Sequence, residues 1–273
     1  MEEYHYKTIE QLSLLIKNKK LSPVEITENI LKRISILDPE YKSYVTVMHE
    51  QAITSAQNAE KEIATGNYRG PLHGVPIAVK DLCFTKGVRT MGGCKVMENH
   101  IPSYDATVID KLNNAGAVLI GKLNLTEGAM RGYHPEFEIP VNPWNKDKWV
   151  GNSSSGSGVA TALGLCFGSL GSDTGGSIRF PSACCGIVGL KPTWGRVSRY
   201  GILALAESLD HVGPMTRSSA ELNYARAIAG YDKNDPTSLT DVIPDISKTI
   251  NNSIKGIRLV SMKNMLLKMS MKK

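Results

Sequence analysis

Apolar residues in the first 69 positions recur at helical spacing and predict three helices. Capping-box patterns mark the starts of the first two, because a hydroxyl side chain is followed three residues later by Gln or Glu. A proline should end the second helix, and a glycine the third. The predicted helices begin near Thr8, Ser22 and His49, and the last two end at Asp38-Pro39 and Gly66. Residues 1–69 are therefore expected to form a peripheral helical part.

After Gly70, short runs of β-branched and apolar residues alternate with helical patterns. Strands are expected at 75–79 and 117–121, and helices at about 107–114, 159–167 and 218–230. Alternation of this kind is typical of an α/β protein with a layered sheet. Residues 231–256 are rich in Asp, Pro, Ser and Asn and predict a surface connection, and a further strand should open at 256–260.

The charge of the chain is concentrated at its end. The hydrophobic content of 41% over 273 residues is ample for a buried core, and the net charge is +6. Six basic residues and no acidic one lie between positions 255 and 273, so the rest of the chain is neutral. A neutral body lacks the basic stripe of a nucleic-acid-binding protein, and we expect no direct nucleic-acid partner. The Met- and Lys-rich tail at 257–273 fits either a basic amphipathic segment or, as we favour, the point where a longer protein would continue.

The five cysteines are odd in number, and none has the spacing of a zinc or redox pair. They indicate free thiols in a reducing compartment. The first residues resemble no secretory signal, and no apolar run is long enough to span a membrane, so we expect a cytoplasmic protein without a membrane partner. Gly116–Lys122 imitates a phosphate-binding loop, but Leu123 stands where Ser or Thr is required. No metal and no cofactor is expected.

Two loops rich in serine and glycine carry the candidate chemistry. Ser177 lies in the run 171–181, and a second cluster occupies 151–158. A serine hydroxyl is a weak nucleophile at neutral pH, so it needs a nearby base and N–H groups that receive the developing oxyanion. Glycines at 175 and 176 can take the positive φ that a nest of N–H groups requires. These loops predict a serine nucleophile.

Either a histidine or a lysine could act as the base for that serine. Six histidines leave a Ser-His-Asp arrangement possible by count, although no Gly-x-Ser-x-Gly elbow surrounds Ser177. Lys80 follows the apolar run 75–79, and a lysine desolvated at a strand end can accept a proton near neutral pH. Asp173 and Arg179 flank the nucleophile with opposite charge and are expected to form a structural ion pair. Tyr133 and His134 could face a substrate, but a structural role is favoured for both.

The sequence around these residues resembles the amidase signature family of Ser-Ser-Lys hydrolases. The similarity extends from about Thr8 to Gly256, which we take as one domain, 1–256. The motifs that carry it are Val79-Lys80-Asp81, the serine-rich run 151–158, Gly175-Gly-Ser-Ile-Arg-Phe-Pro181 and Gly189-Leu-Lys-Pro-Thr-Trp-Gly-Arg-Val-Ser198.

The resemblance implies a large mixed sheet between helical layers, and a catalytic triad. In it Ser177 is the nucleophile, Ser153 is a bridging serine on a cis peptide, and Lys80 is the base. The oxyanion hole would consist of the N–H groups of Thr174, Gly175, Gly176 and Ser177. A relay through a second serine is chemically sensible, because it can pass the proton from the nucleophile to the lysine and back to the leaving amine.

Two departures from the family pattern stand out. Asn152 precedes the bridging serine where the family usually has Gly, and family members are considerably longer, so the chain resembles a truncated member. Three functions stay open: a stand-alone amidase acting on a small amide, the glutamine-hydrolysing A subunit of glutamyl-tRNA(Gln) amidotransferase with its partner subunits, and an inactive fragment. Segments 128–135 and 153–161 look more like the stand-alone amidases. Acyl and amine specificity and a homodimeric state are left open.

Overall fold

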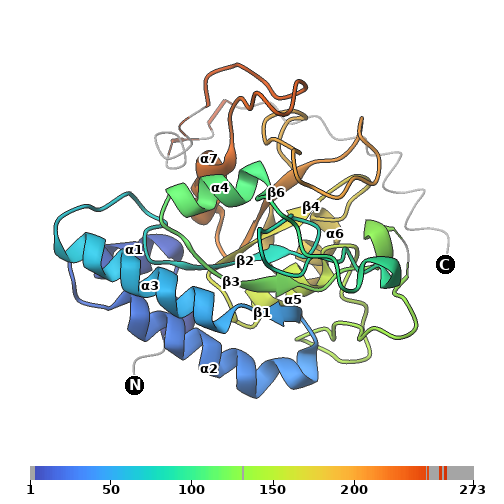
Figure 1. Ribbon diagram of the computed structural model, residues 1–273, viewed down its shortest axis with the longest axis horizontal. Helices are drawn as coiled ribbons and strands as arrows, with labels where there is room; N and C mark the ends of the chain where they lie inside the picture. The colour runs from blue at the N-terminus through green and yellow to red at the C-terminus, as the bar shows by residue number, and fades with distance from the viewer. Residues whose placement is uncertain (1–3, 131, 244, 246–251, 254, 257–273) are drawn as a thin grey trace.

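The computed structural model describes residues 4–130, 132–243, 245, 252–253 and 255–256. The strand expected at 256–260 and the basic tail at 257–273 lie outside the described residues, apart from Gly256. A mixed sheet of six strands, surrounded by helices, forms the centre of the molecule (Figure 1). The predicted α/β fold class is thereby confirmed.

The sheet has the strand order β1-β3-β2-β4-β6-β5. Strand β2 pairs in parallel with both β3 and β4, whereas β1, β5 and β6 join antiparallel. The strand bounds are β1 Tyr44–Val47, β2 Pro76–Lys80, β3 Val118–Leu123, β4 Gly168–Ser172, β5 Val188–Gly189 and β6 Val212–Thr216. Every residue of β2, β3, β4 and β6 is buried. Because successive side chains point to opposite faces, the central sheet is covered on both faces.

The three N-terminal helices are α1 Ile9–Lys17, α2 Pro23–Tyr41 and α3 His49–Ala64. Their starts agree with the sequence, and Thr8 forms the predicted capping box with Gln11. The predicted end of the second helix at Asp38-Pro39 is wrong, since α2 runs through Pro39 to Tyr41. The proline is tolerated because it lies in the last turn, where Lys42 takes a left-handed conformation and its N–H donates to the carbonyl of Asp38.

Residues 1–69 also contain β1, which the apolar pattern did not predict. This strand lies at the edge of the sheet beside β3. The carboxylate of Asp38 accepts hydrogen bonds from the N–H groups of Ser43 and Tyr44 at 2.8 and 3.1 Å, and so fixes the turn from α2 into β1. The apolar faces of α1 and α2 belong to the same core cluster as β2 and β3. The helices are therefore an outer layer of one core.

The remaining helices of the described residues are η1 Tyr4–Tyr6, η2 Lys95–Met97, α4 Thr107–Asn114, η3 Glu127–Ala129, α5 Ser155–Ala162, α6 Arg179–Cys185, η4 Ser219–Tyr224 and α7 Ala225–Ile228. Helix α4 matches its prediction. The helix expected at 159–167 is wrong at both ends: α5 starts at Ser155 and stops before a glycine turn at Gly164, with φ of 65°. The helix expected at 218–230 is instead η4 followed by α7. The expected surface connection after 231 buries Asp232, Asp235 and Ser238.

The parallel pairing of β2 with β4 determines where the candidate site residues lie. In this pair Ile77 lies opposite Gly168 and Val79 opposite Leu170. Lys80 and Ser172 therefore end neighbouring strands at the same edge of the sheet. Helix α5 follows the first serine loop and α6 follows the second, and the two helices pack against each other. The register thus brings Lys80 and both serine loops to one place.

Candidate active site

Lys80 is completely buried, and its ammonium position is surrounded by serine hydroxyls. Its Nζ lies 2.7 Å from Oγ of Ser153 and 2.9 Å from Oγ of both Ser154 and Ser172. No carboxylate forms an ion pair with Lys80 in the described part of the chain. A buried charge without a counter-ion is costly, so the environment favours the neutral amine.

Burial lowers the pKa of Lys80 from 10.5 to about 7. The more distant negative charges of Asp173 and Asp210 oppose this shift but do not cancel it. A lysine with a pKa near 7 carries a lone pair on a large fraction of molecules at neutral pH. The side chain can therefore accept a proton, which an ordinary lysine cannot.

The first serine loop leads into α5 through a cis peptide bond between Asn152 and Ser153. Gly151 precedes it with φ of 75°, and an added Cβ there would lie 2.6 Å from the backbone of Pro181. The two serine loops thus touch through their backbones at a position that has no room for a side chain. Ser153 and Ser154 are both buried. Asn152 occupies the position where the family usually has glycine, and the cis bond is present with it.

Ser177 lies beside the first serine loop and is half-buried. The N–H of Ser154 donates to the carbonyl of Ser177 at 3.2 Å, which ties the two loops together. Within the described residues the hydroxyl of Ser177 has no hydrogen-bond partner, so Ser177 is joined to the first loop through the backbone of Ser154 and not through a hydroxyl contact with Ser153. The structure therefore brings Lys80 and Ser153 into direct contact and places Ser177 next to them.

The N–H groups of the second loop differ in how they are used. The N–H of Gly176 donates to Oδ1 of Asp173 at 2.8 Å, so this predicted oxyanion donor is already engaged. The N–H groups of Thr174, Gly175 and Ser177 have no acceptor among the described residues. Gly176 has φ of 128°, as the sequence suggested, but Gly175 does not have a positive φ. Three donors therefore remain free to receive an oxyanion.

Asp173 holds the second loop in shape. Its buried carboxylate accepts hydrogen bonds from Nε and an amino group of Arg179 at 3.0 and 3.1 Å, and from the N–H of Ile178 at 3.2 Å. Lys191 adds an ion pair at 3.1 Å, which the sequence did not suggest. Burial alone would raise the pKa of Asp173, but the bonds from Arg179, Lys191 and the backbone hold it well below its usual range. The predicted ion pair of Asp173 with Arg179 is present.

Three polar residues near the site were missed from the sequence. Ser154 and Ser172 contact Lys80 as closely as the bridging serine does. Asp210 accepts a hydrogen bond from the hydroxyl of Thr174 in the second loop. A signal was available for Ser154, because it lies within the serine-rich run. No comparable signal marked Ser172, because the strand that carries it was not predicted. The sequence Gly-Ser-Leu-Gly-Ser has too little β-branched content to be recognised as β4.

Tyr133 holds the end of the first serine loop through a hydrogen bond to Ser155. Its hydroxyl lies 2.7 Å from Oγ of Ser155, the first residue of α5. Burial raises the pKa of Tyr133 to about 12, so the phenol stays protonated as a donor. The structural role favoured for this residue agrees with that contact. His134 accepts a hydrogen bond from the N–H of Glu136 at 3.3 Å.

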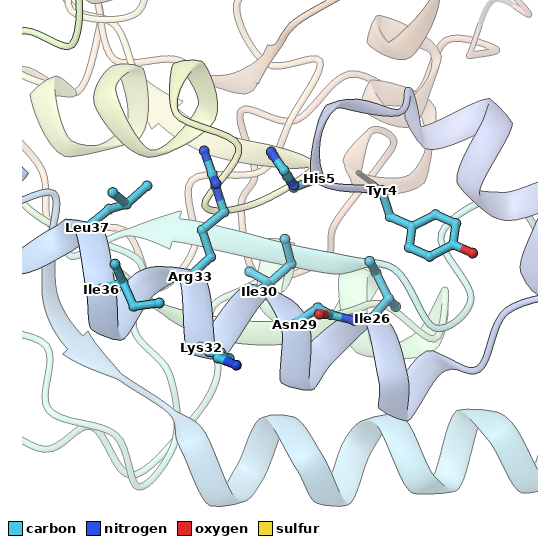
Figure 2. A pocket seen from close by; sticks show the side chains of 9 residues that line it. All are labelled: Tyr4, His5, Ile26, Asn29, Ile30, Lys32, Arg33, Ile36 and Leu37. Carbon is cyan, nitrogen blue, oxygen red and sulfur yellow. The ribbon is translucent and has the colours of Figure 1, made fainter. Parts of the chain in front are cut away.

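Two hollows lie outside this centre. One, of about 240 Å³, runs along α2, where Figure 2 shows Ile26, Ile30 and Arg33 facing Tyr4 and His5 of the N-terminal turn. The other, of about 550 Å³, is lined among others by Trp194, Arg199 and Asp210. Neither includes Lys80, Ser153 or Ser177. No group of His, Cys, Asp or Glu side chains in the described ranges could bind a metal ion, and none of the helices there has the length and apolar character to cross a bilayer.

The fold and the lysine–serine centre define an α/β protein of the amidase type, and the family comparison agrees. The model of the family named Amidase matches residues 25–272. The chain therefore belongs to the amidase family.

Relatives with two different names match the chain. The chain is 55% identical over 232 residues to "Putative amidase AmiD" of Mycobacterium tuberculosis, which covers 85% of this chain and 49% of that protein. It is 46% identical over 255 residues to the A subunit of the glutamyl-tRNA(Gln) amidotransferase of Geobacter metallireducens, covering 92% of this chain and 52% of the relative. The chain thus spans about half the length of the curated relatives it matches.

A solved structure shows the same fold. The native peptide amidase from Stenotrophomonas maltophilia superposes with a TM-score of 0.85 at 34% identity, covering 90% of this chain and 53% of the amidase. The described sheet and helices of this chain therefore correspond to about half of that enzyme.

Proposed function

We propose that the chain hydrolyses carboxylic amides through an acyl-enzyme on Ser177, with Lys80 as the base and Ser153 as the relay. One observation carries the proposal: a buried lysine without a counter-ion, with a pKa near 7, contacts a serine hydroxyl beside a loop with free N–H groups. An ordinary structural lysine would be paired with a carboxylate.

The hydrogen-bond directions around Lys80 support the relay. A neutral amine has two N–H donors and one lone pair. The hydroxyl of Ser154 donates its single proton to the carbonyl of Ser172 at 3.1 Å, so it must accept from Lys80. If Ser172 takes the second donor, the lone pair faces the hydroxyl of Ser153. That hydroxyl can then give its proton to Lys80 and take one from Ser177.

The reaction would proceed in two halves. Ser177 Oγ attacks the amide carbonyl while its proton passes through Ser153 to Lys80, and the N–H groups of Thr174, Gly175 and Ser177 receive the oxyanion. Lys80 returns the proton through Ser153 to the leaving nitrogen as the C–N bond breaks. Water then attacks the acyl-enzyme by the same proton route and releases the carboxylic acid. The half-buried position of Ser177 leaves it accessible to a substrate.

A stand-alone amidase is the form of this function we favour. The AmiD relative is 55% identical, against 46% for the relative from the amidotransferase. The alternative is glutamine hydrolysis that supplies ammonia to amidotransferase partner subunits, as the second relative's name suggests. A non-catalytic fragment is the third reading. We also propose a cytoplasmic location, which the free thiols of the described chain support.

Labelling with a fluorophosphonate tests the nucleophile. We expect a single covalent adduct on the peptide that contains Ser177, and none after Ser177→Ala. Lys80→Ala and Ser153→Ala should each slow labelling by ~10² or more, since general-base catalysis contributes about that factor. Ser157→Ala is the matched control, because this buried serine donates to the carbonyl of Leu170 and does not touch Lys80.

Labelling, combined with assays of amide hydrolysis and of glutamine hydrolysis with partner subunits, separates the three functions. An adduct at another serine of the folded chain would refute the assignment of Ser177. Labelling with hydrolysis of simple amides supports the stand-alone amidase. Glutamine hydrolysis that appears only with amidotransferase partner subunits would favour the second function, and a folded chain that neither labels nor hydrolyses amides is the fragment.

A further inference from the structure

An exposed pair of aromatic rings stands beside the two serine loops. Trp149 and Phe180 are 56% and 51% exposed, although large apolar side chains usually seek the interior. Their ring centroids are 6.1 Å apart at an interplanar angle of 48°, a favourable geometry for two aromatic rings. Trp149 lies four residues before Ser153, and Phe180 three residues after Ser177. We call these two side chains the aromatic shelf.

The shelf is held directly against the nucleophile loop. A Cβ added to Gly176 would lie 2.4 Å from the ring of Phe180, so this ring covers the residue next to Ser177. The N–H of Phe180 also donates to the carbonyl of Gly176 at 2.7 Å. The glycine at this position therefore both takes its positive φ and makes space for the ring.

The backbone of Trp149 is held by a separate contact. Asn142 donates from Nδ2 to the carbonyls of Trp149 at 2.9 Å and of Cys184 at 3.2 Å. This amide ties the approach to the first serine loop to helix α6, which carries Phe180. Backbone contacts therefore place the two residues, and the rings then meet each other. Hydrophobic and aromatic side chains line most ligand sites, where a few polar groups supply orientation.

We infer that the aromatic shelf binds the apolar or aryl substituent of the amide substrate, and that the chain prefers aryl-substituted amides to small aliphatic ones. This inference rests on the proposed function. An aryl ring on the shelf would be stacked next to Gly176, with its carboxamide directed to Ser177 and the free N–H groups. Aromatic stacking and removal of the rings from water would both favour such substrates.

Binding to an inactive variant tests the shelf independently of the chemistry. In Ser177→Ala, phenylacetamide should bind at least about tenfold more tightly than acetamide by calorimetry, which corresponds to about 1.4 kcal/mol. Adding Trp149→Ala or Phe180→Ala should reduce this preference to less than about threefold, whereas Trp149→Phe and Phe180→Tyr should keep most of it. Tyr231→Ala is the control, since Tyr231 is an aromatic residue with 58% exposure outside the serine loops.

The outcomes distinguish the shelf from the proposed function. Suppose that Ser177→Ala prefers phenylacetamide to acetamide and needs both rings for this preference, but that Ser177 of the parent chain takes no acyl group. This result would uphold the shelf and reject the proposed hydrolase. Acylation of Ser177 in the parent chain without a preference for the aryl amide would reject the shelf alone. If Trp149→Ala or Phe180→Ala instead changes the sedimentation of the chain, the shelf is a docking surface between protein chains and the inference is wrong.

Discussion

Lys80 and Lys122 are both fully buried and lie on neighbouring strands, yet their surroundings differ. Lys122 Nζ lies 2.6 Å from the carbonyl of Cys83 and from the hydroxyl of Thr90, and 3.7 Å from the carboxylate of Asp81. Among the residues that the structure describes, the hydrogen-bond partners of Lys80 are all serine hydroxyls. Lys80 therefore has no carboxylate beside it, as the proposed base requires, whereas Lys122 has that of Asp81.

The pH dependence of turnover follows from this difference. Burial lowers the pKa of Lys80 to about 7, and only the neutral amine can accept the proton of the serine relay. We expect kcat/KM for amide hydrolysis to rise about tenfold per pH unit below pH 7 and to level off above it. A pH profile between 5 and 9 measures this. A profile that stays flat across that range would contradict the role of Lys80.

Stability should respond in opposite directions at the two lysines. The lowered pKa of Lys80 means that the unfolded state binds more protons between about pH 7 and 10.5, so this lysine destabilises the fold most at pH 7 and below. Lys80→Met should raise the free energy of unfolding by about 1–3 kcal/mol at pH 7, a gain that shrinks as the pH rises toward 10. Urea titrations at several pH values test the trend.

Lys122→Met provides the matched comparison. It leaves the buried carboxylate of Asp81 without its cation, which should lower the free energy of unfolding by about 3–5 kcal/mol. The assignment of the two lysines fails if both variants shift stability in the same direction at pH 7.

The turn that carries Ser177, the proposed nucleophile, is organised by one carboxylate. Asp173 receives hydrogen bonds from Gly176, Ile178 and Arg179, all within the segment that leads into α6. Its pKa is lowered, so its contribution to stability is complete above the unfolded value of about 4 and is lost as the pH falls toward the folded one. Asp173→Asn should cost about 2–4 kcal/mol at pH 7 and flatten the acid limb of the stability curve.

Denaturant midpoints between pH 2 and 7 measure the effect of Asp173→Asn. Arg226→Gln is a control, because its ion pair with Asp245 at 3.0 Å involves a half-exposed side chain. An acid limb equally steep in the parent chain and in Asp173→Asn would show that another carboxylate controls it.

Sequence reasoning succeeded where a local signal was strong. The start of α2 at Ser22-Pro23 and the whole of α4 were predicted, because capping residues and helical spacing are local properties. Lys80 and both serine loops were identified from their motifs. The Asn152–Ser153 peptide is cis, as the family resemblance implied.

The remaining elements depend on contacts that a single stretch of sequence does not contain. Strand β4 is built from glycine, serine and one leucine, and β6 contains Pro214, so neither has the composition of a strand. Both form because their neighbours in the sheet supply hydrogen-bond partners and burial. Ser172 became a neighbour of Lys80 through the register of β2 with β4, which no spacing in the sequence reveals.

At the scale of the whole molecule, the N-terminal helices and the central sheet share one core. Leu12 of α1 is fully buried in the cluster that also contains Ile77 and Val79 of β2. Arg217 adds polar links, since it donates to the carbonyls of Lys7 at 3.0 Å and Thr161 at 3.1 Å. A single cooperative unfolding transition is the expected consequence.

Two leucines of one helix test this cooperativity. Leu12→Ala should lower the free energy of unfolding by about 2–5 kcal/mol and shift the circular dichroism and tryptophan fluorescence transitions by the same amount. Leu14→Ala, at a position that is 52% exposed, should change either transition little. Separate shifts of the two signals would mean that the helices and the sheet unfold independently.

The two glycines before Ser177 differ in the side chains that their positions could hold. Gly176 has no room for a side chain because the ring of Phe180 lies against it, whereas a Cβ on Gly175 would meet no atom within 4 Å and needs no unusual backbone angle. Other side chains can therefore replace the hydrogen of Gly175 without disturbing the loop that carries Ser177. A library randomised at this codon, screened against a panel of amides, would be a direct route to new selectivities, while the same effort at position 176 would return mostly misfolded clones.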